Sequence, residues 1–128
     1  MSYYFNKMLN GEFNSVVEKV TGALKAEGFG VLTEIDVKET LKKKLDIDFK
    51  KYKILGACNP SFAYKALQAE DKIGAMLPCN ITVIEQDNGN IEVAAVDPVA
   101  SMQAIQNQSL LSIANEVRSK LKKVIDSF

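Results

Sequence analysis

The sequence predicts an α+β domain, a two-layer sandwich in which helices cover a five-stranded, mainly antiparallel sheet. Short β-type runs alternate with helical runs along the chain, a pattern typical of helices packed on a sheet. An Asn-Gly turn between two alternating runs, at residues 87–90, predicts a hairpin. The 128 residues, 47% of them apolar, suit one core. We therefore expect a single domain over residues 1–128.

The first quarter of the chain predicts a strand followed by a helix. Residues 3–9 carry aromatic side chains and leucine and precede an Asn-Gly turn, which favours a strand. Apolar residues then recur at helical spacing over residues 14–27, with Asn14 as the expected N-cap and Gly28 ending the helix. Glycine inside a helix costs about 1 kcal/mol relative to alanine. Gly22 is therefore expected to mark close packing.

A second strand and a short helix follow. The strand is expected over residues 29–35, and its alternation predicts that four residues share one face: Phe29, Val31, Thr33 and Ile35. Asp36 and Glu39 have capping-box spacing and begin a helix over residues 37–45. The lysine run at residues 42–44 is interpreted as a solvated helix end rather than an anion or nucleic-acid patch.

The second half of the chain supplies the remaining strands and the longest helix. A strand over residues 53–58 is apolar on both faces and is expected inside the sheet. Asn59 is the expected N-cap of a helix that begins with Pro60 at its first position. The later elements are a strand over 77–86 that begins near Pro78, a strand over 91–96, a loose segment over 99–107 and an amphipathic helix over 108–126. Helices 14–27 and 108–126 each have one apolar stripe, so both should cover the same sheet face.

Composition excludes several classes of function. Sixteen basic and sixteen acidic residues give zero net charge, which argues against nucleic-acid binding. No apolar run is long enough to span a membrane, and the start does not resemble a secretory signal. We therefore expect a cytoplasmic protein with free thiols. The chain has no histidine, which removes histidine-dependent nucleophilic catalysis and most zinc sites.

The two cysteines lie in two similar corners, Cys58-Asn59-Pro60 and Pro78-Cys79-Asn80, which bracket one helix. Antiparallel pairing of the flanking strands is expected to bring both corners to one concave spot. If the thiols have a function, they are either a redox dithiol or a two-thiolate site for a soft metal such as Cu(I). The favoured interpretation is that both are small buried hydrophobic side chains. Two thiolates are an incomplete metal site, so none is predicted.

Three further polar residues belong to the candidate site. Asn59 and Asn80 are expected to cap or support turns, with lining of a polar pocket beside the cysteines as the alternative. In that alternative the backbone N–H groups of Ser61 and Phe62 hold an anion. Asp97, which precedes Pro98, is interpreted as a turn residue rather than as a catalytic acid or base.

The corner motifs resemble the bacterial and archaeal family called domain of unknown function 302. The resemblance rests on Cys58-Asn59-Pro60, Leu77-Pro78-Cys79-Asn80, Asp97-Pro98, Gly28-Phe29-Gly30-Val31 and Tyr52-Lys53-Ile54-Leu55. It implies a β-α-β(4)-α fold similar to that of the TATA-binding protein, with extra short helices inserted. It also suggests a homodimer. It implies no activity, and a fold shared with a DNA-binding protein does not transfer function.

Two functional hypotheses follow from these observations. The first is a dimeric ligand-binding or sensory domain that holds a small molecule or anion at the two corners and does not bind membranes. The second is a thiol-based redox enzyme or soft-metal-handling protein that uses Cys58 and Cys79. The accessibility of the thiols separates the two hypotheses.

Overall fold

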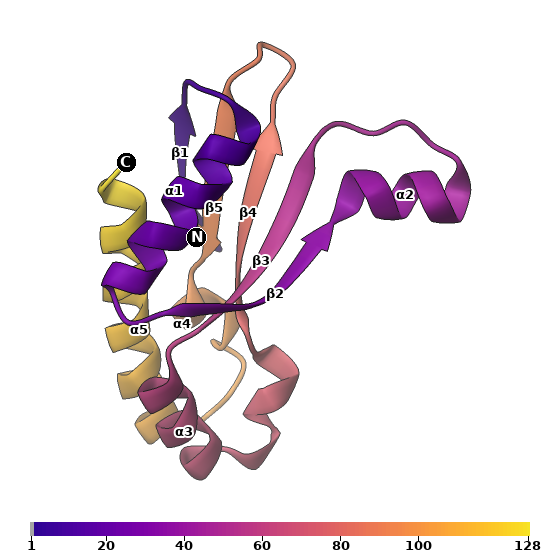
Figure 1. Ribbon diagram of the computed structural model, residues 1–128. Helices are drawn as coiled ribbons and strands as arrows, with labels where there is room; N and C mark the ends of the chain where they lie inside the picture. The colour runs from indigo at the N-terminus through magenta and orange to yellow at the C-terminus, as the bar shows by residue number, and fades with distance from the viewer. Residues whose placement is uncertain (1) are drawn as a thin grey trace.

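The computed structural model describes residues 2–128, which form a five-stranded sheet with helices packed against it (Figure 1). The strand order is β1-β5-β4-β3-β2, and neighbouring strands are antiparallel. The strands are β1 (Tyr4–Leu9), β2 (Gly30–Asp36), β3 (Tyr52–Cys58), β4 (Cys79–Glu85) and β5 (Ile91–Val96). The predicted α+β class and β-α-β(4)-α order are confirmed, and β3 lies inside the sheet as expected.

Two long helices cover one face of this sheet. These are α1 (Phe13–Ala26) and α5 (Gln108–Asp126), and Figure 1 shows them on the same side, as predicted. Their apolar stripes pack with alternate residues of β3, β4 and β5 in the main core, which includes Val20, Leu24, Leu55, Ile81, Val93, Leu121 and Val124. Burial of these stripes is what places both helices on one layer.

A second, smaller core lies at the end of the sheet where the short helices gather (Figure 1). The elements there are α3 (Pro60–Ala69), the 3-10 helix η1 (Asp71–Met76) and α4 (Pro98–Ser101). The buried members of this core are Ala66, Ile73, Met102, Leu110 and Ala114. The first half of α5 belongs to this core and its second half to the main core, so α5 connects the two.

The start of α1 differs from the prediction. The N-cap is Glu12, whose carboxylate accepts hydrogen bonds from the backbone N–H groups of Asn14 at 2.6 Å and Ser15 at 3.3 Å. The helix begins one residue early because this cap leaves Phe13 in the first turn, where it is buried in the main core. The prediction for Gly22 was wrong as well. Gly22 is exposed, and a Cβ built there would meet no atom within 4 Å.

A β-bulge in β2 changes which residues share a face. Val31 pairs with Ala57 but Thr33 pairs with Gly56, so the ladder skips Leu32. Ala57 and Gly56 point to opposite faces of β3. Val31 therefore faces the covered side with Ala57, whereas Thr33 and Ile35 face the other side, and the predicted shared face was wrong. A bulge also re-aims the skipped side chain.

In the second half of the chain, one strand is shorter than expected and two connecting segments are more regular than expected. β4 begins at Cys79 rather than at residue 77, because Pro78 has no N–H to donate to the sheet. The segment predicted to be loose contains α4, which the Asp97 side chain caps. The segment that follows α3 forms η1.

The sheet face opposite α1 and α5 remains accessible. Tyr4 and Met8 of β1 are exposed there, and Thr82, Ile84 and Ala94 are half-buried. The β2–β3 connection carries α2 (Val37–Leu45), which projects away from the body of the molecule (Figure 1). Among residues 2–128, no helix combines the length and apolar character required to cross a bilayer.

Candidate functional site

The two cysteine corners meet at one end of the β3–β4 pair. Ala57 lies opposite Cys79, and Gly56 lies opposite Asn80. Cys58 is the last residue of β3 and Cys79 is the first of β4, so antiparallel pairing brings both corners together. The predicted meeting of the two strand ends is confirmed.

A cavity of about 340 Å³ opens at this meeting point, between the main core and the second core. Both cysteines, Asn59 and Pro78 line it. The other lining residues are apolar side chains or glycine: Phe29, Leu32, Ala57, Phe62, Ala63, Ala66, Leu67, Gly74, Leu77, Pro98, Met102, Leu110, Ile113, Ala114 and Val117. No charged side chain belongs to this lining, so the cavity resembles an apolar ligand pocket.

Gly56 allows Pro78 and Thr33 to lie close to the β3 backbone. A Cβ at this position would overlap the Thr33 hydroxyl oxygen and would lie 2.7 Å from the Pro78 ring. Real Cβ atoms do not tolerate such contacts, so only glycine fits between these two residues. The ring of Pro78 thereby packs against β3 and forms part of the cavity wall.

Asn59 occupies the N-cap position of α3, but its side chain does not cap the helix. Its amide nitrogen instead donates a hydrogen bond to the backbone carbonyl of Glu27 at 3.4 Å. A Cβ on Gly28 would lie 3.2 Å from that nitrogen, so the glycine leaves room for the amide. Asn59 is the N-cap residue of α3 as predicted, but its side chain makes no capping bond because the amide connects α3 to the end of α1. Pro60 does begin α3, as predicted, and is not among the cavity-lining residues.

The two thiols differ in their environment. Both cysteines are free, Cys58 is half-buried and Cys79 is buried. Burial raises the pKa of the Cys79 thiol from 9.0 to about 11, with a smaller contribution from the nearby Cys58. Cys79 is therefore protonated at neutral pH, which is the unreactive form of a thiol.

Asn80 does not join the other corner residues. Cys79 faces the covered side of the sheet, so alternation places Asn80 on the opposite, accessible face. It borders a separate hollow of about 370 Å³ there, with Tyr4, Thr82 and Ala94 among its neighbours. The prediction that all corner residues converge on one spot was wrong for Asn80.

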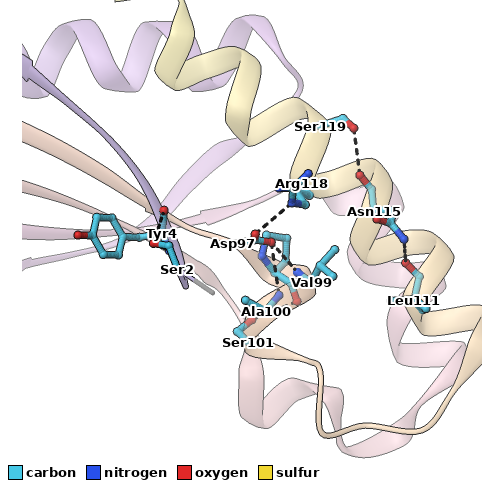
Figure 2. A network of polar contacts seen from close by, with 11 residues as sticks. Ser2, Tyr4, Asp97, Val99, Ala100, Ser101, Leu111, Asn115, Arg118 and Ser119 are labelled. Carbon is cyan, nitrogen blue, oxygen red and sulfur yellow. Dashed lines mark hydrogen bonds and ion pairs between the residues drawn. The ribbon is translucent and has the colours of Figure 1, made fainter.

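Asp97 is a buried structural residue next to the cavity. Its carboxylate accepts hydrogen bonds from the backbone N–H groups of Val99 at 3.0 Å and Ala100 at 3.4 Å, and so caps α4. Its other oxygen accepts a hydrogen bond from Arg118 Nε at 3.0 Å (Figure 2). Asp97 is not among the lining residues, although the following Pro98 is.

Sequence reasoning missed most of the cavity wall. Four lining residues, Leu110, Ile113, Ala114 and Val117, lie on the apolar stripe of α5, which the sequence assigned to the core. Leu32 reaches the cavity through the bulge, which had no signal in the sequence. Ala63 and Ala66 on α3 also line the cavity, and nothing in the sequence indicates that these small side chains leave a gap.

The fold and the corner geometry together define a small α+β domain with a cavity at the end of its sheet. A family model described as Domain of unknown function DUF302 matches residues 5–128, so the chain belongs to the DUF302 family. The chain is similar to the crystal structure of an uncharacterized conserved DUF302 protein from Bacillus stearothermophilus. That likeness has a TM-score of 0.91 and 28% identity over 98% of each chain. No curated protein matches the chain.

Proposed function

We propose that this protein is a ligand-binding or sensory domain whose site is the corner cavity. The observation that carries the proposal is the cavity itself, about 340 Å³ with an almost wholly apolar lining. Small-molecule sites usually occupy about 300–1,000 Å³ and combine apolar walls with a few polar groups. The polar side chain here is that of Asn59, and both cysteines also line the cavity.

The location of the cavity also supports this function. Protein interiors are close-packed, and large gaps between cores are uncommon. Phe29 and Val117 of the main core and Met102 and Ala114 of the second core all line this cavity. A ligand in the cavity contacts both cores and so stabilises their relative position.

Of the two ligand classes expected from the sequence, a small molecule or an anion, the anion fits the cavity less well. The N-terminus of α3 lacks a side-chain cap, which leaves its first backbone N–H groups as donors. However, no charged side chain lines the cavity, and an ion buried there would lose its hydration without an opposite charge. An apolar or mostly apolar small molecule fits better.

The thiol hypothesis is the second candidate, because both cysteines line the same cavity. The raised pKa of Cys79 weighs against it, since the thiolate is the nucleophile and the metal ligand. Among residues 2–128, no group of three or more His, Cys, Asp or Glu side chains is arranged to hold a metal ion. Ligand binding therefore remains the main proposal.

We also propose that the protein forms a homodimer through the accessible sheet face. This face carries the exposed side chains of Tyr4 and Met8 and the half-buried Ile84, Ala94 and Val96. Apolar side chains exposed on a sheet face are more stable when a partner covers them. The β-α-β(4)-α order also supports a likeness to the TATA-binding-protein fold, without any claim of DNA binding.

Urea unfolding with and without a water-soluble apolar probe such as 1-octanol tests the binding proposal. A ligand that binds only the folded state raises the free energy of unfolding as its concentration exceeds Kd. We expect this increase in the wild type and in Ala26→Leu, which lies on the exposed side of α1. We expect its loss in Ala66→Leu, which fills the cavity. Equal responses of all three proteins contradict the proposal.

A further inference from the structure

The lining of the corner cavity restricts the part of a ligand that can enter it. Asn59 carries the one polar side chain of the lining other than the two thiols, and its amide nitrogen already donates to the Glu27 carbonyl. A second polar group inside would lose its hydrogen bonds to water without a full replacement. The buried part of the ligand is therefore hydrocarbon.

The cavity extends along α5. Its lining residues on α5 run from Leu110 to Val117, which corresponds to about 10 Å along the helix axis. A volume of about 340 Å³ beside this stretch of helix has room for an extended hydrocarbon chain, and we call this space the slot. The slot exists because α3 presents Ala63 and Ala66, and α5 presents Ala114, where longer side chains would close the gap.

The mouth of the slot is apolar as well. Leu32 and Leu67 line the cavity and yet are 69% and 46% exposed. Leu32 lies at the bulge of β2, which removes it from the sheet alternation. Just beside the lining, the Lys65 ammonium lies 5.6 Å from the centre of the Phe62 ring. A solvated positive charge thus lies beside one aromatic ring of the cavity lining.

We propose that the ligand of this cavity is an amphiphile with one linear aliphatic chain. The chain fills the slot along α5 and crosses Leu32 and Leu67, and its single polar group stays at the mouth in water. This inference rests on the proposed function, because it names the ligand class of the same site. The competing occupant is a compact aromatic molecule, which does not extend from the cavity across Leu32 and Leu67 and so leaves them exposed.

Calorimetric titration with straight-chain alcohols of increasing length tests the proposal. Each added methylene is expected to strengthen binding about fourfold, since burial of one CH₂ contributes about 0.8 kcal/mol, until the slot is full. The diol with hydroxyl groups at both ends of the same chain is expected to bind at least about thirtyfold more weakly, because one hydroxyl enters the slot. Naphthalene serves as the compact aromatic comparison.

Two variants and a control sharpen the test. Ala66→Leu is expected to abolish the gain with chain length, and Ala63→Leu provides a second filled slot at a half-buried position if the first variant unfolds. Ala26→Leu is expected to retain the full gain. Binding of naphthalene without any gain along the alcohol series overturns the aliphatic-chain inference and leaves the binding function standing. Binding of none of these compounds overturns both.

Discussion

Cys79 lies opposite Ala57 in the β3–β4 ladder, one residue out of register with Cys58, and both sulfur-bearing residues line the same cavity. The offset places the two thiols in different surroundings, since Cys79 is buried and Cys58 is half-buried. The two cysteines are therefore expected to differ in reactivity.

Alkylation with iodoacetamide at pH 7.5 measures this difference. Cys58 is expected to react first because it is more accessible, and Cys79 is expected to react only as fast as the structure opens. Intact-mass spectrometry of Cys58→Ser and Cys79→Ser reports each thiol separately. Rapid modification of Cys79 in the folded protein would revive the thiol hypothesis.

The raised pKa of Cys79 also predicts a pH dependence of stability. The folded thiol has a pKa of about 11, against an ordinary value of 9.0, so above pH 9 the unfolded chain loses this proton first. The stabilisation is therefore complete below pH 9 and is lost as pH rises toward 11. Its full size is roughly 3 kcal/mol, at about 1.4 kcal/mol per pKa unit. Urea unfolding of the wild type and Cys79→Ala is expected to show a steeper decline for the wild type across this range. Equal declines of the free energy of unfolding in both proteins would contradict the raised pKa of Cys79.

A pair of glycine substitutions tests the close approach at the corners. Gly56→Ala is expected to lower the free energy of unfolding by roughly 1–3 kcal/mol, because its Cβ would overlap Thr33 and Pro78. Gly22→Ala is the matched control. It is expected to raise the free energy of unfolding by up to about 1 kcal/mol, since it lies in an exposed part of α1 with no atom nearby. Similar effects of both substitutions would be inconsistent with the proposed packing.

Asp97→Ala is expected to lower the free energy of unfolding by about 1–3 kcal/mol. The substitution removes the α4 cap and the partner of Arg118 in one step (Figure 2). Asp126→Ala removes an exposed pair with Lys122 and is expected to change stability by less than about 1 kcal/mol. Chemical denaturation of both variants gives the comparison. Equal losses would show that Asp97 has no special structural role.

Ala94→Lys tests the proposed dimer. Ala94 lies between Asn6 and Thr82 in the sheet, so a lysine there places a charge in the middle of the accessible face. We expect a dimer for the wild type and for Ala26→Lys, and a monomer for Ala94→Lys, by light scattering at micromolar concentration. A monomeric wild type would contradict the dimer proposal.

The fold was predictable because its signals are local. The stripes of α1 and α5, the Asn-Gly turn and Pro60 at the start of α3 fix elements from neighbouring residues alone. The candidate site was predictable in part, because antiparallel pairing brings Cys58 and Cys79 together whatever the details. Strand alternation after Cys79 by itself places Asn80 on the other face, whereas the bulge at Leu32 and the Asn59–Glu27 bond depend on tertiary contacts. No local pattern encodes such contacts.

The most direct test of the corner cavity as a ligand site is a methyl NMR titration with 1-octanol. Concentration-dependent shifts are expected at the methyl groups of Leu67, Leu110 and Ile113, which line the cavity. No shift is expected at Ile84, which borders the hollow on the opposite sheet face. Shifts confined to Ile84, or shifts at neither set of methyl groups, would contradict it.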